Sequence, residues 1–337
     1  MTKTFKLGAI FFICVLWMVL IRIAVGFMNL SDNVLSWLFS FLVQCIGMGL
    51  IPFVLYKQWI KGSVKEDFHL QTKINPLYYL IAVLLGFLLY YVTMGVSLIY
   101  QNLLILLGFK HVTTSVGVVY SGWEVLAMQF ITVAILPAFF EEFVDRGLLM
   151  SVFRNEEDER KKLILMAVIF ALAHQNITQT GYTIVGGLVL AFMALKTKSI
   201  WPGVIIHFIN NGINVILDYS SQKQNFVGKI YDEFQTFLSN NIFLIMATWI
   251  ATGFIIVYLL KIADKISKKE KKEEVQLQNE IDLTERIYKL FGMDSQSSKQ
   301  TPALQGKTRA WEYGMVLASA ALCFLTTLFT FIWGLLR

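Results

Sequence analysis

The sequence predicts an all-α, polytopic bundle of about eight or nine transmembrane helices. Of its 337 residues, 56% are hydrophobic and 15% are charged, and the mean hydropathy is +0.61. That composition is too apolar for an ordinary soluble domain. Apolar runs recur along the chain, and as helices most of them could cross a hydrocarbon core of about 30 Å. Lipid is therefore the expected main solvent of this protein.

The first apolar run follows Lys3 and Lys6, as the apolar part of a signal sequence would. It is long, however, contains Arg22 and ends without a small-residue cleavage site, so we expect it to be retained as an anchor. The predicted spans are approximately 7–28, 34–56, 77–107, 123–153, 163–178, 182–197, 200–217, 241–260 and 313–336.

Lysine and arginine fall almost entirely in alternate loops between these runs. The loops that would lie outside hold only Lys110, Lys223 and Lys229. Because basic loops stay on the cytoplasmic side, this asymmetry predicts a multi-pass protein of the cell membrane with a cytoplasmic N-terminus. The same placement accounts for the net charge of +6 and argues against a nucleic-acid partner. The three scattered cysteines predict neither disulfides nor a metal site.

Charged and strongly polar residues interrupt three of the apolar runs. A charge at the bilayer centre costs at least about 2.5 kcal/mol, so each needs a partner, a wet cavity or a function. Glu141, His174 and His207 lie about 14 to 20 Å of helix from the nearest cytoplasmic charge, at a rise of ~1.5 Å per residue. Since three separate helices carry polar groups to nearly one level, the sequence predicts a shared, buried intramembrane cavity.

The spacing within each motif separates their expected roles. Glu142 and Arg146 are four residues apart, as an intrahelical ion pair requires, which leaves Glu141 free to face the cavity. His207 and Asn211 share one helical face and could both donate to a developing oxyanion. Pro137 removes a backbone donor, so we expect a kink just before Glu141.

These motifs resemble those of the CAAX protease and bacteriocin-processing (CPBP, or Abi) family of intramembrane proteases. The family pattern is EExxxR, then FxxxH, then HxxxN or HxxxD on successive helices. Here the matching residues, over roughly 120–218, are Glu141-Glu142-x-x-x-Arg146, Phe170-x-x-x-His174 and His207-x-x-x-Asn211.

The resemblance implies a membrane-embedded helical fold and glutamate-dependent peptide hydrolysis. Glu141 would be the general base and would hold the attacking water together with His174. His207 and Asn211 would form the oxyanion hole, with Glu142 and Arg146 in support. One residue departs from the pattern, because Asp145 stands where the family often has an aromatic or other apolar residue. An acid there could compete with Glu142 for Arg146.

The predicted organisation has five parts. Residues 1–120 are N-terminal transmembrane helices, 121–218 the catalytic core, 219–260 a further transmembrane helix, 261–312 a charged cytosolic connector and 313–337 a C-terminal transmembrane helix. In the connector, apolar residues at roughly helical spacing predict a short amphipathic helix that touches lipid headgroups or docks a partner. They are Ile281, Leu283, Ile287, Leu290 and Phe291.

The function expected is that of an intramembrane endopeptidase without a cofactor, acting on a membrane-associated or lipidated peptide or peptide precursor. Its substrate would enter from the membrane or the cytosolic side. One alternative adds zinc, held by His174, His207 and Glu141, although there is no HExxH motif. Another is a non-catalytic scaffold or regulator of the same fold. A transporter is opposed by the lack of paired broken helices and of an inverted repeat.

Overall fold

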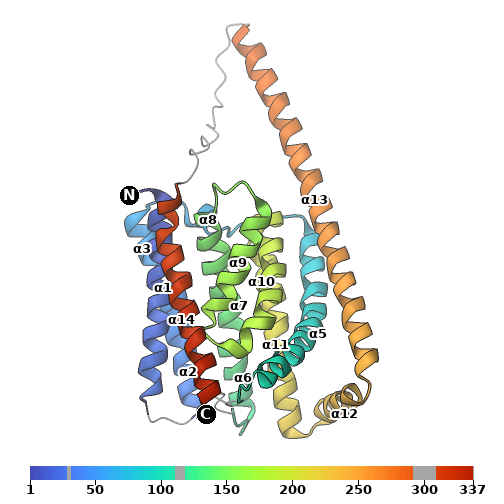
Figure 1. Ribbon diagram of the computed structural model, residues 1–337. Helices are drawn as coiled ribbons and strands as arrows, with labels where there is room; N and C mark the ends of the chain where they lie inside the picture. Colours follow the sequence, from blue (N-terminus) through green and yellow to red (C-terminus); the bar gives the residue numbers. More distant parts are fainter. Residues whose placement is uncertain (29–31, 111–117, 291–308, 337) are drawn as a thin grey trace.

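The computed structural model describes residues 1–28, 32–110, 118–290 and 309–336, and all regular structure in these ranges is helical (Figure 1). The all-α prediction is therefore confirmed. In chain order the elements are α1 (Lys3–Gly26), α2 (Asp32–Phe41), η1 (Leu42–Leu50), α3 (Ile51–Trp59), α4 (Val64–Asp67), α5 (Pro76–Leu106), α6 (Trp123–Gln129), η2 (Phe130–Ile135), α7 (Leu136–Glu142), η3 (Phe143–Leu149), α8 (Met150–Val152), α9 (Glu159–Ala173), α10 (Ile177–Thr197), α11 (Trp201–Lys223), α12 (Phe226–Asn240), α13 (Ile242–Leu290), η4 (Ala310–Tyr313) and α14 (Gly314–Leu336). The stretches η1 to η3 are π-helical and η4 is a 3₁₀ turn.

Within the described residues, seven stretches are long and apolar enough to cross a membrane. They are Lys3–Val25, Asn33–Trp59, Pro76–Leu106, Trp123–Val152, Ile177–Thr197, Phe243–Thr284 and Ala310–Leu336. The other two predicted spans, 163–178 and 200–217, correspond to α9, which packs on α10, and α11, which packs on α5. These two helices are less apolar because α9 begins with four charged residues and α11 carries several asparagines.

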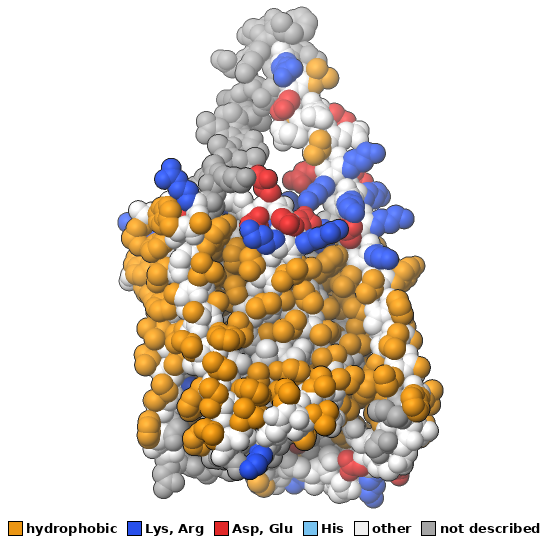
Figure 2. Space-filling view, viewed as in Figure 1, with side chains coloured by type: hydrophobic (Ala, Val, Ile, Leu, Met, Phe, Trp, Pro, Cys, Tyr) orange, Lys and Arg blue, Asp and Glu red, His pale blue; other side chains and the backbone are white. Residues whose placement is uncertain are grey.

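Hydrophobic side chains form a broad belt across the face of the bundle seen in Figure 2. Lysine, arginine, aspartate and glutamate gather beyond one edge of this belt, at the end where α1 begins and α13 projects; we call it the basic end. The opposite end, where α12 lies, is called the α12 end. An apolar belt between two polar edges is the surface that a lipid bilayer requires.

The chain turns between α9 and α10 earlier than the predicted spans 163–178 and 182–197 imply. Helix α9 ends at Ala173 and α10 begins at Ile177, so the turn is only three residues long. Gln175 adopts a left-handed conformation with φ 51°, and the side chain of Asn176 caps α10 by accepting from the Thr178 amide at 3.1 Å. This N-cap fixes the residue at which α10 begins and leaves His174 directly after the last residue of α9.

Helix α13 runs without interruption across the predicted boundary at residue 261, instead of ending there and restarting as a short amphipathic helix. Polar contacts attach α13 to the rest of the bundle at the basic end. Lys196 pairs with Asp264 at 2.8 Å, and Ser267 donates to the Lys196 carbonyl at 3.0 Å. Tyr78 donates to Glu270 at 2.9 Å. Further along, Ile281 and Leu283 are exposed, and Phe291 lies outside the described residues.

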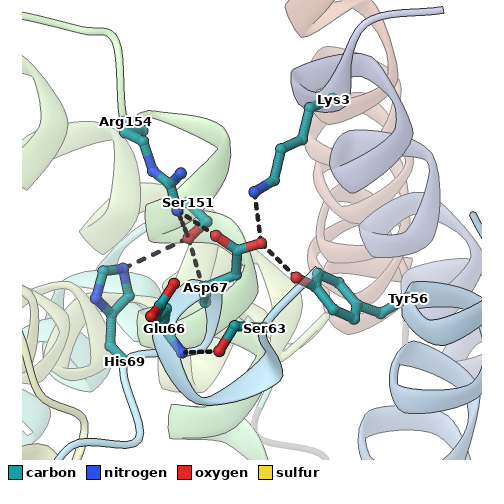
Figure 3. A network of polar contacts seen from close by, with 8 residues as sticks. All are labelled: Lys3, Tyr56, Ser63, Glu66, Asp67, His69, Ser151 and Arg154. Carbon is teal, nitrogen blue, oxygen red and sulfur yellow. Dashed lines mark hydrogen bonds and ion pairs between the residues drawn. The ribbon is translucent and has the colours of Figure 1, made fainter. Parts of the chain in front are cut away.

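A second group of polar residues closes the basic end around Asp67, the last residue of α4 (Figure 3). Its carboxylate accepts from Tyr56 and Arg154 and pairs with Lys3 at 2.6 Å. Ser151 donates to the Asp67 carbonyl at 2.5 Å and lies 3.5 Å from Nε2 of His69. We call these six residues the Asp67 cluster. It ties α1, α3, α4 and α8 together.

Asp67 and His69 of the Asp67 cluster both have lowered pKa values. Burial by itself would raise the pKa of the Asp67 carboxyl, but hydrogen bonds from Lys3, Tyr56 and Arg154 outweigh it and hold the pKa below its usual value. Burial, with the nearby charge of Arg154, lowers the pKa of His69 to about 4. At neutral pH the cluster therefore holds an ionised Asp67 beside an uncharged His69.

Candidate active site

The helical segment that carries Glu141 changes from π-helical to α-helical next to Pro137, where the sequence predicted a kink. Just before it, in the π-helical stretch η2, the Leu136 amide donates to the Ile131 carbonyl, five residues back. Pro137 has no amide hydrogen to donate one turn back, and the change from π-helical to α-helical bonding falls at the same place, so carbonyls of that turn need other donors. Side chains from other helices supply them. Ser40 donates to the Thr132 carbonyl at 2.6 Å, and Asn211 donates to the Val133 carbonyl at 3.0 Å.

Glu141 lies on the wall of a cavity and has one oxygen fixed and one free. Gln44 donates to Oε1 at 2.8 Å. Oε2 is buried without a hydrogen-bond partner among the described residues, and Nε2 of His207 lies 3.9 Å from it. A carboxylate held on one side and unpaired on the other can accept a proton from a bound water.

Glu142 and Arg146 form the predicted ion pair, at 2.8 Å, and both side chains are fully buried. The same Glu142 oxygen lies 3.1 Å from Nδ1 of His207, so it orients that imidazole. The guanidinium of Arg146 lies over the ring of Phe170, 4.1 Å from its centroid. On the other side, a Cβ atom at Gly203 would come within 2.5 Å of Glu142 Oε2. Only glycine leaves space for this carboxylate.

His174 is fixed by the end of its own helix. Its Nδ1 lies 2.9 Å from the Phe170 carbonyl, to which it can only donate, so Nε2 is left as an acceptor that faces the cavity in the neutral ring. Arg22 donates to the His174 carbonyl at 3.1 Å and so satisfies the exposed end of α9. The ring of Phe170 packs edge-on against both His174 and His207, at centroid distances of 4.8 and 6.0 Å.

Asp145 does not compete for Arg146. No ion pair joins it to the described residues, and its side chain is buried with Oδ1 unpaired. It does not line the cavity of Glu141, but it lies close enough to interact electrostatically with Arg146, Glu141 and Glu142. The residue that departs from the family pattern is thus a buried neighbour of the site that lies outside the cavity wall.

The four predicted catalytic residues line one cavity of about 1070 Å³. Glu141, His174, His207 and Asn211 come from α7, the α9–α10 turn and α11. Around them the wall combines apolar side chains with hydroxyls and amides. This arrangement brings a carboxylate, two imidazoles and an amide within reach of one extended peptide.

The metal alternative lacks a ready set of ligands. Among the residues that the structure describes, no three His, Cys, Asp or Glu side chains are placed to hold one ion. The donor set does not fit the three-ligand sites typical of catalytic zinc.

Sequence reasoning missed two residues that touch the site. Gln44 donates a hydrogen bond to Glu141. Its position as a polar residue in the middle of the apolar run 34–56 could have indicated a role in the site. Arg22, noted above only as a charge within the first apolar run, lines the cavity and donates to the backbone carbonyl of His174.

The fold and this site define a multi-pass helical membrane protein with a buried carboxylate–imidazole centre. The sequence model of one family, described as type II CAAX prenyl endopeptidase Rce1-like, matches residues 123–213. That range contains all three motifs, and the resemblance inferred from them is confirmed. The match supports a membrane protease of the CAAX prenyl endopeptidase type. No curated protein and no solved structure matches the chain.

Proposed function

We propose that this protein is an intramembrane endopeptidase in which Glu141 activates water. The observation that carries the proposal is the free oxygen of Glu141, buried in a cavity opposite Nε2 of His207 and held on its other side by Gln44. We further propose that the protein lies in the cell membrane with its N-terminus in the cytoplasm, because the Lys- and Arg-rich end carries the N-terminus.

The proposed reaction begins with a water between Glu141 Oε2 and His174 Nε2. Glu141 takes one proton, and the oxygen attacks the carbonyl carbon of the scissile peptide bond. Glu141 then returns that proton to the leaving nitrogen as the C–N bond breaks. The products are a free carboxylate and a free amine, and no metal or other cofactor takes part.

His207 and Asn211 are proposed to stabilise the oxyanion of the tetrahedral intermediate. One amide hydrogen of Asn211 is used on the Val133 carbonyl, and the second remains for the oxyanion. His207 needs a proton on Nε2 as well as on Nδ1. The carboxylates of Glu141 and Glu142 lie 3.9 and 3.1 Å from its two ring nitrogens and would stabilise that imidazolium. Contacts with Glu142 and the Val133 carbonyl hold the two proposed donors in place before the reaction, which is what makes such donors effective.

The substrate is proposed to be a membrane-associated or lipidated peptide or peptide precursor. Candidates are prenylated C-terminal peptides, bacteriocin or signalling-peptide precursors and export leaders. The lipid bilayer is its direct surroundings, and the part of α13 beyond the bundle, within 261–312, is a proposed partner site.

The test compares the membrane peptidomes of cells that carry the wild-type protein, Glu141→Gln or Asp145→Asn. Both variants replace a carboxylate by an amide on neighbouring turns of one helical segment, but only Glu141 lines the cavity. We expect peptides to be lost with Glu141→Gln and retained with Asp145→Asn. An unchanged peptidome with Glu141→Gln would contradict hydrolysis and favour the non-catalytic scaffold.

A second measurement addresses zinc. Purified protein is treated with a chelator, and cleavage of a peptide identified above is followed. We expect full activity. Stoichiometric bound zinc, with activity lost to the chelator and restored by the metal, would favour the zinc-dependent alternative.

A further inference from the structure

The active-site cavity extends from Glu141 toward one end of the bundle only. On α5, which begins at the basic end, the lining residues run from Leu89 to Gln101, so the first ~20 Å of that helix lies outside the cavity at a rise of ~1.5 Å per residue. On α10, which runs in the opposite direction, they run from Thr178 to Leu190 and stop short of the basic end. Both helices place the cavity between the site and the α12 end.

Close packing closes the site toward the basic end. Gly147 follows the catalytic motif, and a Cβ atom there would lie 3.0 Å from the Phe68 carbonyl oxygen. The Phe68 ring, which is fully buried, stacks on Phe143 with a centroid distance of 4.3 Å. The Asp67 cluster holds this segment in place from the outside. A peptide arriving at the basic end would meet this packed layer before it reached Glu141.

The cavity wall toward the α12 end is polar and mostly uncharged. Asn210 and Asn214 continue the face of α11 beyond the site, and Gln179 faces them from α10. Tyr231 and Gln235 contribute from α12. Amide and hydroxyl side chains both donate and accept hydrogen bonds, so such a wall can bind the backbone of an extended peptide of any side-chain charge.

Helix α12 has the surface expected of an interfacial helix. Its exposed apolar residues Phe226, Ile230, Phe234 and Phe237 recur every three or four positions and so share a face. Tyr231 and Gln235, on another face, line the cavity. A helix that turns an apolar face to lipid and a polar face to a cavity forms a wall at the membrane surface.

We propose that the peptide substrate enters from the α12 end and is therefore cleaved in a segment presented on the non-cytoplasmic side of the membrane. This inference rests on the proposed protease function and on the cytoplasmic placement of the basic end. It replaces the membrane or cytosolic entry expected from the sequence. The substrate class is the non-cytoplasmic, juxtamembrane part of a membrane-anchored or exported peptide.

The test measures access to the cavity without using catalysis. Single cysteines are introduced as Asn214→Cys in the cavity, Lys223→Cys at the α12 end and Lys65→Cys at the basic end, where both lysines are exposed. Vesicles of each orientation receive a membrane-impermeant maleimide. The unsubstituted protein, in which Cys14 and Cys323 are buried and Cys45 is half-buried, gives the background.

We expect Asn214→Cys to be labelled from the side that labels Lys223→Cys and not from the side that labels Lys65→Cys. Labelling from the Lys65→Cys side, or from neither side, would overturn the inference. The same pattern is expected when Glu141→Gln is added, because access does not require hydrolysis. If Glu141→Gln still cleaves the peptide but the labelling pattern is as expected, the proposed role of Glu141 in hydrolysis is wrong. The inference that the cavity opens at the α12 end is then still supported.

A second arm connects entrance and cleavage. A bulky maleimide on Asn214→Cys should abolish cleavage of the identified peptide, whereas the same reagent on Lys223→Cys should leave it unchanged. Undiminished cleavage by fully labelled Asn214→Cys would show that the substrate takes another route.

Discussion

The site around Glu141 and the Asp67 cluster both bury carboxylates beside basic side chains, yet they differ in how completely their polar atoms are paired. Glu141, Glu142 and Arg146 each keep at least one buried side-chain atom without a hydrogen-bond partner among the described residues. No atom of the Asp67 cluster has that status. Unpaired buried polar atoms are costly, whereas paired ones hold segments together. This contrast is the one expected if the Glu141 site is catalytic, as proposed, and the Asp67 cluster is structural.

The largest effect on activity is expected from Glu141→Gln. Removing a general base typically slows a reaction by about 10²- to 10⁴-fold. Cleavage of an identified peptide by purified protein in detergent measures the rate. The amide retains the size of the side chain, so the unfolding midpoint should stay close to that of the wild type. A large drop in that midpoint would mean that Glu141 stabilises the fold, as the Asp67 cluster does. The two regions would then not differ in the way described above.

Next comes Arg146→Met, which leaves Glu142 charged and buried without its partner. Breaking a buried pair in this way costs about 3–5 kcal/mol of unfolding free energy. Cleavage should be lost as well, because Glu142 orients His207. The double variant Glu142→Gln with Arg146→Met should recover part of the stability but none of the activity. Recovery of activity in the double variant would contradict the orienting role of Glu142.

Asp67→Asn should lower stability without lowering activity, the opposite of what is expected for Glu141→Gln. Loss of the charge weakens the contacts to Lys3 and Arg154, with an expected cost of about 1–3 kcal/mol in unfolding free energy. The cleavage rate per folded molecule should be retained. A loss of rate without a loss of stability would mean that the Asp67 cluster acts on the site directly.

The smallest effect is a pH dependence of stability. His69 has a folded pKa of about 4 against an ordinary value of 6.5, so the unfolded chain binds more protons between these values and stability falls as the pH drops from 6.5 to 4. The lowered pKa of Asp67 acts below that window: its contribution is fully present above the ordinary value of 3.8 and is lost as the pH falls through the folded pKa.

Unfolding midpoints of the wild type and His69→Gln, measured from pH 7 to pH 4, check this dependence. The variant should lose most of the slope between pH 6.5 and 4. An identical slope in both proteins would assign the dependence to other groups.

The catalytic candidates could be found from the sequence because a charged or imidazole group inside an apolar run is costly and therefore conspicuous. Gln44 was not found, since a single uncharged amide in a span is cheap enough to pass for packing. The turn after His174 comes earlier in the chain than predicted because the side chain of Asn176 caps α10.

The Asp67 cluster escaped prediction for a different reason. Lys3, Asp67 and Arg154 lie in loops or at helix ends, where charges already serve to mark topology. Nothing in their spacing shows that three distant segments converge. The length of α13 could not be predicted either. A dense run of charged residues after residue 261 is as compatible with a loop as with a solvated helix.

The bond from Asn211 to the Val133 carbonyl makes residues 137 and 211 interdependent in evolution. Pro137 leaves that carbonyl without its donor, and the Asn211 amide supplies one. An ionised aspartate, the other residue of the HxxxN or HxxxD pattern, cannot donate a hydrogen bond. A chain with an ionised aspartate here would lack this bond, and the Val133 carbonyl would need another donor, from a side chain or from water in the cavity that Val133 lines. The effect of a substitution at residue 211 is therefore expected to depend on whether residue 137 is proline, because both act on the same backbone carbonyl of the helix that carries Glu141.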